Sequence, residues 1–145
     1  MASQSMIARL DSTHYILVRD RFIAKADELK AKLHKNIHID IDPMIALRNV
    51  FEAEHAYIVN GYLVVYDITT MWWSDTPILA EQLVFALEPD SSFLSVIEFF
   101  EAKAIEVGAK YIAVGTALSK SDRALAAVYA KHGFKQMAIN LAKEV

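Results

Sequence analysis

The sequence predicts an α+β fold in which a central, mostly antiparallel mixed sheet is flanked by about four helices. Three neighbouring segments in the middle of the chain are rich in β-branched and aromatic residues, which is typical of strands. Segments whose apolar residues recur every three or four positions lie before and after them, which is typical of helices. The 145 residues suit a single domain over residues 1–145, and the 54% hydrophobic content supplies its core.

The N-terminal part is expected to form a short strand and two helices. The strand covers residues 7–10, and Asp11 offers a cap for a helix over residues 15–35, because short side-chain oxygens accept hydrogen bonds from the first free amides. The second helix begins at Asp42-Pro43, since proline is favoured in a first turn. The apolar stripe of the first helix consists of Val18, Phe22, Ala26, Leu29 and Leu33.

The middle of the chain is expected to form three consecutive antiparallel strands over residues 56–59, 62–68 and 78–87. Asn60-Gly61 between the first two is a strong signal for a two-residue hairpin turn, because both turn positions require a positive φ. The C-terminal part is then expected to alternate between helix and strand. Its elements are a helix that ends at Gly108, a strand over 111–118, a helix that ends at Gly133 and a last strand over 134–142.

Charge and composition exclude several classes of protein. The net charge of −3 argues against a general nucleic-acid-binding protein, which needs a positive field to attract phosphates. The absence of cysteine excludes disulfides and a cysteine nucleophile. No apolar run reaches the ~18 residues of a spanning helix, and the N-terminus has no secretory pattern, so we expect a cytoplasmic protein that does not bind membranes.

The C-terminal half resembles the GNAT N-acetyltransferase family. Residues 124–134, A-L-A-A-V-Y-A-K-H-G-F, are similar to the late helix and turn of the family, often written A-x-x-L-Y-E-K-x-G-F. Residues 98–114 resemble the family's central helix, its glycine exit and the strand that follows, and residues 83–90 resemble the strand and turn before that helix. The resemblance implies a GNAT-like fold and acetyl-CoA as the cofactor.

The chain departs from the family at the cofactor loop. Family members usually carry Q/R-x-x-G-x-G/A there, and the glycines let backbone amides close on the pyrophosphate of coenzyme A. This chain has E-P-D-S-S-F-L-S over residues 88–95, with no glycine and with no Lys or Arg before Lys103. The resemblance then implies that the hydroxyls of Ser91 and Ser92 replace the glycines.

Three further residues are implied in cofactor binding by the resemblance. The backbone groups of Phe85 and Leu87 would pair with the pantetheine arm. Asp122 stands seven residues before Tyr129, where the family often has Asn.

Glu81 is the most unusual residue by its pattern. Strict alternation places it on one strand face with the apolar residues Leu79, Leu83, Phe85 and Leu87. A carboxylate on such a face is costly unless it is paired or protonated, and one with a raised pKa can remove a proton from a substrate amine. Many GNAT enzymes resemble this arrangement. The alternative is a structural Glu that pairs with a buried Arg or Lys, or that is exposed past a bulge.

Tyr129 matches the family position whose hydroxyl protonates the departing thiolate, which would make it the catalytic acid beside Glu81 as the base. The alternative is core packing, since Tyr129 continues a helical stripe with Leu125 and Val128. No metal site is expected. His34 and His38 have the i, i+4 spacing of two ligands on one helix face, but no third ligand stands out.

Trp72 and Trp73 lie on a turn and are candidate anchors for a protein partner or a homodimer, because exposed aromatic side chains dominate binding hot spots. Tyr57, Tyr62 and Tyr66 would extend such a patch if they were exposed, whereas a tryptophan that covers the core would abolish it. Residues 72–77, W-W-S-D-T-P, resemble GNAT-like proteins of tailed bacteriophages.

Two functions therefore stand side by side. The first is an acetyl-CoA-dependent N-acetyltransferase with an atypical pyrophosphate loop. The second is a catalytically inactive GNAT-fold protein that binds another protein, or that serves as a phage structural or accessory component in the host cytoplasm or the virion.

Overall fold

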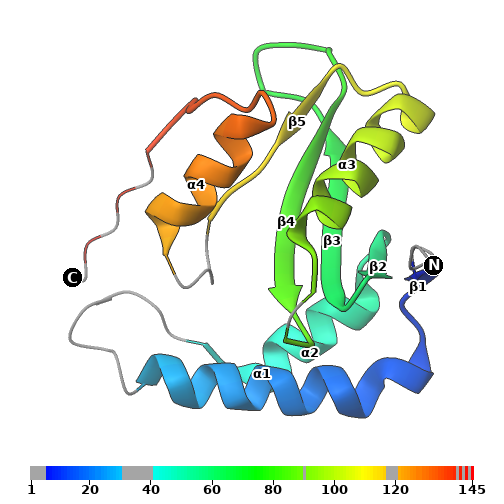
Figure 1. Cartoon of the computed structure of the whole chain (residues 1–145), viewed down its shortest axis with the longest axis vertical. Helices are drawn as coiled ribbons and strands as arrows, with labels where there is room; N and C mark the ends of the chain where they lie inside the picture. Colours follow the sequence, from blue (N-terminus) through cyan, green and yellow to red (C-terminus); the bar gives the residue numbers. More distant parts are fainter. Residues whose placement is uncertain are drawn as a thin grey trace.

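A five-stranded sheet in the order β1-β2-β3-β4-β5 forms the centre of the computed structural model (Figure 1). The structure describes residues 6–30, 41–89, 91–116, 121–139, 141, 143 and 145. Its elements are β1 (Ile7–Arg9), a 3-10 turn (Ser12–His14), α1 (Tyr15–Lys30), α2 (Pro43–Glu52), β2 (Ala56–Val59), β3 (Tyr62–Thr69), β4 (Ile78–Ala86), α3 (Phe93–Val107), β5 (Tyr111–Ala113) and α4 (Asp122–Lys131).

The sheet is mixed, as the sequence predicts. The pairs β1–β2, β2–β3 and β3–β4 are antiparallel, whereas β4 and β5 run parallel. The predicted hairpin is confirmed, because Asn60 and Gly61 join β2 to β3 with φ angles of 45° and 82°. Asp42 and Ser121 cap α2 and α4 through their side chains, and Gly108 ends α3 in the left-handed region.

Two apolar layers cover the two faces of this sheet. On one face α1 and α2 bury Val18, Phe22, Leu47 and Val50 against Leu63, Val65, Phe85 and Leu87. On the other face α3 buries Val96, Phe99, Phe100 and Ala104 against Val59, Val64, Tyr66 and Leu79. Val18, Phe22 and Ala26 confirm the predicted stripe of α1, while Leu33 and the side chain of Leu29 lie outside the part of the chain that is described.

A β-bulge in β4 changes which side chains share a face. Val65 pairs with Leu83 and Tyr66 pairs with Glu81, so Gln82 is the extra residue in β4. The alternation is inverted at this point: Leu79 packs under α3, whereas Leu83, Phe85 and Leu87 pack toward α1 and α2. The prediction that Glu81 shares a face with Leu83, Phe85 and Leu87 is therefore wrong.

The last predicted strand, over residues 134–142, is also wrong. The described residues of this segment form no strand, and Met137, Ile139 and Leu141 are exposed. Alternating apolar residues suit a strand, but a strand needs an edge to pair with. β5, which was expected over 111–118, ends at Ala113, and residues 117 and 118 are outside the described chain. Among the described helices, none has both the length and the apolar character that crossing a membrane requires.

Candidate functional site

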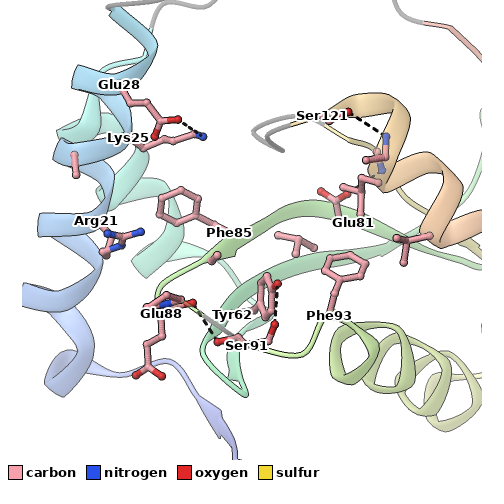
Figure 2. A pocket seen from close by; sticks show the side chains of 18 residues that line it. Arg21, Lys25, Glu28, Tyr62, Glu81, Phe85, Glu88, Ser91, Phe93 and Ser121 are labelled. Carbon is pink, nitrogen blue, oxygen red and sulfur yellow. Dashed lines mark hydrogen bonds and ion pairs between the residues drawn. The ribbon is translucent and has the colours of Figure 1, made fainter.

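A cleft of about 550 Å³ opens where β4 and β5 part. The two strands pair only from Ile78–Ala80 to Tyr111–Ala113, so this edge of β4 has no described partner strand over residues 81–86. The cleft is lined by Arg21, Ala24, Lys25 and Glu28 of α1, by Tyr62 of β3, by Glu81, Val84, Phe85 and Ala86 of β4, by Glu88, Pro89, Ser91 and Phe93 after it, and by Gly115, Ser121, Ala124, Leu125 and Val128 on the far side (Figure 2).

Glu81 stands at the point where the strands part. Its Oε1 accepts a hydrogen bond of 2.8 Å from the amide of Gly115, the residue at which the chain has left β5. Burial raises the pKa of the Glu81 carboxyl, and the Gly115 amide opposes this shift. No Lys or Arg among the described residues forms an ion pair with Glu81, so the structural alternative of a buried pair is not realised there.

Tyr129 is buried beside this carboxylate. Its side chain is 3% exposed, and its hydroxyl has no hydrogen-bond partner within the described chain. Burial raises the pKa of the phenol strongly, and the negative charge of Glu81 adds to the shift. The ring packs against Phe93 and Phe134, with centroid distances of 5.3 and 5.0 Å. Tyr129 therefore packs in the interior. Its hydroxyl, which has no described partner, also lies close enough to Glu81 for the carboxylate charge to raise the pKa of the phenol.

The tip of the β2–β3 hairpin holds the turn between β4 and α3. The Gly61 carbonyl accepts hydrogen bonds from the amides of Leu87 (2.8 Å) and Glu88 (3.3 Å). Asn60 Nδ2 donates to Ser95 Oγ at 2.6 Å. A Cβ atom on Gly61 would lie 2.3 Å from Ser91 Oγ, so the hairpin approaches the turn as closely as a glycine allows. The sequence predicts the hairpin but carries no signal for this contact.

Of the five residues predicted to bind the cofactor, two line the cleft and three do not. Phe85 and Ser91 line the cleft. Leu87 does not: its side chain is buried toward α1 and α2, and its amide is bound to Gly61. Ser92 and Asp122 lie at the starts of α3 and α4, outside the cleft lining, although their neighbours Phe93 and Ser121 belong to it. Ser92 makes no side-chain capping bond at the start of α3, and Asp90 is outside the described residues.

The two tryptophans are exposed, as a partner-binding role requires. Trp72 is 90% and Trp73 is 66% exposed, and their rings meet edge to face at 5.2 Å. The tyrosines that could have extended the patch do not: Tyr57, Tyr62 and Tyr66 pack in the layer under α3. The candidate metal residues His34 and His38 lie outside the described residues, and the described part of the chain holds no group of His, Asp and Glu suited to a metal ion.

Comparison with known proteins shows the fold. No protein-family model matches the sequence, and no curated protein matches it. The structure is similar to a GNAT-family acetyltransferase from Listeria monocytogenes 4b F2365, with a TM-score of 0.65 and 15% identity over 94% of this chain and 89% of that chain. It is also similar to a transcriptional regulator from Bacillus halodurans C-125, with a TM-score of 0.63 and 12% identity over 98% and 100% of the two chains.

A third similar structure was solved with a bisubstrate analogue that contains coenzyme A. It is AAC(6')-Iy in complex with the bisubstrate analogue CoA-S-monomethyl-acetylneamine, with a TM-score of 0.57 and 18% identity over 99% of this chain and 100% of that chain. These likenesses confirm the GNAT-like α+β fold that the sequence predicts.

Proposed function

We propose that the protein transfers an acetyl group from acetyl-CoA to an amine in the cleft between β4 and α4. One observation carries the proposal: a half-buried carboxylate and a buried phenol with no described hydrogen-bond partner lie near each other where β4 and β5 part. Buried polar groups are normally paired, so a phenol that has no described partner and lies near Glu81, a residue of the cleft lining, indicates a group that a ligand satisfies. That a protein of similar structure binds a coenzyme A conjugate supports this assignment.

The residues present fit such a cofactor in three respects. The cleft has a volume of about 550 Å³, and the edge of β4 that has no described partner strand offers backbone groups to an amide-containing arm. Tyr129 lies outside the cleft lining, and its buried hydroxyl has no described partner. When bound, acetyl-CoA supplies an acetyl thioester, and transfer of the acetyl group to nitrogen breaks the C–S bond and releases a thiol. Ser91 at the mouth of the cleft supplies a hydroxyl where the family's glycine loop is missing.

Two protons must move in this reaction: one residue accepts the first proton, and another residue donates the second. Glu81 accepts a proton from the attacking amine as the C–N bond forms, and its raised pKa makes it a better base than an ordinary carboxylate. Tyr129 donates its hydroxyl proton to the departing sulfur. Because the pKa of Tyr129 is raised, the phenol carries this proton throughout the physiological range.

The test begins with binding and continues with activity. Acetyl-CoA at 100 times its Kd should stabilise the protein by ~2.7 kcal/mol, which a thermal shift detects. With a panel of amines and detection of the free thiol, Glu81→Gln should lower kcat/KM about 100-fold and Tyr129→Phe about 10-fold. Glu101→Gln, which removes an exposed carboxylate of α3, is the matched control. The absence of any shift at millimolar acetyl-CoA would overturn the proposal.

The exposed tryptophans favour binding of a protein partner. In the second function that we propose, the protein binds such a partner without catalysis, as a phage structural or accessory protein would. For a second copy as the partner, sedimentation should show a dimer that Trp72→Ser with Trp73→Ser converts to a monomer. A wild-type protein that is monomeric and captures nothing specific from a lysate would contradict this function.

A further inference from the structure

Among the described residues, those that give the cleft positive charge come from a single helix. No lysine or arginine occurs between Arg48 and Lys103, so β2, β3, β4 and the turn before α3 contribute none. Lys103 itself forms an ion pair of 3.1 Å with Glu106 and lies over the Tyr57 ring in the layer under α3. Among the described residues that line the cleft, the cations are Arg21 and Lys25, and both belong to α1.

These two cations differ in their partners. Lys25 Nζ lies 3.6 Å from Glu28 Oε1, and its side chain is only 13% exposed, so its charge is already balanced. Arg21 lies one helical turn earlier on the same face of α1, and within the described part of the chain it has no hydrogen bond or ion pair. In Figure 2, Arg21 and Lys25 extend from α1 beside the cleft that Phe85 and Glu88 also line.

A free guanidinium on a cleft wall favours an anionic ligand group. Its planar donors match the oxygens of phosphate and carboxylate, and an arginine keeps its charge at every physiological pH. Three acidic residues belong to the described lining: Glu28 is engaged with Lys25, Glu81 accepts a hydrogen bond from the Gly115 amide, and Glu88 forms no ion pair with a described residue. An anion at Arg21 therefore meets a cation without a competing described partner.

We propose that Arg21 is the anion-binding residue of the cleft and that it binds a phosphate group of coenzyme A. The identity of the coenzyme rests on the function proposed above, whereas the anion preference rests on the cleft itself. In this arrangement α1 supplies the charge that the segment over residues 88–95 lacks. The same guanidinium chemistry would also suit a carboxylate of the acceptor, and the experiment separates the two sources.

Calorimetry at low ionic strength tests the proposal with wild type, Arg21→Gln and Arg19→Gln. Arg19 is the matched control, because it lies on α1, pairs with Asp20 at 3.0 Å and does not line the cleft. Arg21→Gln should raise the Kd of coenzyme A about tenfold, the loss expected for one exposed charge-assisted contact, and Arg19→Gln should change it less than about twofold. Pantetheine, which has no phosphate, should bind all three proteins equally.

Three results would overturn the proposal. The first is that Arg21→Gln and Arg19→Gln weaken the binding of coenzyme A equally, which indicates an effect of bulk charge. The second is that Arg21→Gln weakens the binding of pantetheine as much as that of coenzyme A. The third is that Arg21→Gln leaves the Kd of coenzyme A unchanged and raises the KM of a carboxylate-bearing acceptor. Binding of inorganic pyrophosphate, measured beside that of coenzyme A, distinguishes failure of this proposal from failure of the proposed function. Binding of pyrophosphate that Arg21→Gln weakens, without binding of coenzyme A, overturns the function and retains the anion site. A wild type that binds neither ligand overturns both.

Discussion

Replacing Gly61 by alanine should weaken the turn between β4 and α3, and the structure gives the effect in two parts. Gly61 has a φ of +82°, and a side chain in this left-handed region costs about 1 kcal/mol. The new Cβ would lie 2.3 Å from Ser91 Oγ, so Ser91 must rotate and lose its hydrogen bond to the Glu88 carbonyl, which contributes about 1 kcal/mol. The free energy of unfolding should therefore fall by about 2 kcal/mol.

Urea unfolding followed by circular dichroism measures this loss against a matched control. Gly108 has a φ of +76°, but a Cβ there would meet nothing within 4 Å, so Gly108→Ala should lose only about 1 kcal/mol. Because Ser91→Ala removes the clashing oxygen, Gly61→Ala should cost about 1 kcal/mol less in that background than in wild type. A loss no larger than that of Gly108→Ala, or no relief from Ser91→Ala, would refute the reasoning.

Three further predictions concern the cleft and the core. Because burial raises the pKa of Glu81 in the folded protein, the folded state binds this proton more tightly, and stability falls as pH rises from the unfolded pKa through the folded one. Glu81→Gln should therefore gain stability relative to wild type between pH 4 and pH 7 in urea titrations; a constant difference would contradict this. Tyr129→Phe removes a buried hydroxyl without a described partner and should raise the free energy of unfolding by about 1 kcal/mol while it lowers activity, so a destabilised variant would indicate a hidden partner. Phe100 of α3 is fully buried, so Phe100→Ala should lower the free energy of unfolding by about 3 to 5 kcal/mol in a urea titration. A loss below about 1 kcal/mol would contradict the described core.

Local signals predicted most of the fold. Asn60-Gly61 specifies its hairpin because few other residue pairs accept two positive φ angles, and the structure has the hairpin at this position. The capping residues Asp42 and Ser121 begin helices for an equally local reason, since their side chains bind amides two or three residues ahead. Such features depend on a few neighbouring residues, which are all visible in the sequence.

The predictions that are wrong concern features that depend on pairing between segments far apart in the sequence. The alternation around Glu81 is regular in the sequence, but Gln82 becomes an extra residue because of how β4 pairs with β3, and no local pattern records that. The segment after Gly133 alternates like a strand, yet within the described chain no edge pairs with it.

The candidate site was predicted in part for the same reason. Glu81 was proposed as an unusual polar residue in an apolar segment and Tyr129 through a family resemblance. The structure places them close enough for the charge of Glu81 to raise the pKa of Tyr129, and their catalytic roles stay predictions. Arg21 and Gly61 were not singled out as parts of the cleft and its turn. Each is ordinary in its own segment, one on a polar helix face and one in a hairpin, and each reaches the site only through tertiary folding.

The parting of β4 and β5 gives the cleft one rigid wall and one adjustable wall. β4 is fixed by β3 from Ile78 to Ala86, whereas the described attachments of the opposite side are a three-residue strand, the bond from Gly115 to Glu81 and the packing of Tyr129 against Phe93. Ligand size should therefore be accommodated by displacement of α4 rather than by distortion of the sheet. In hydrogen exchange, a bound ligand would slow the amides of α4 most, because those of β3 and β4 are already protected.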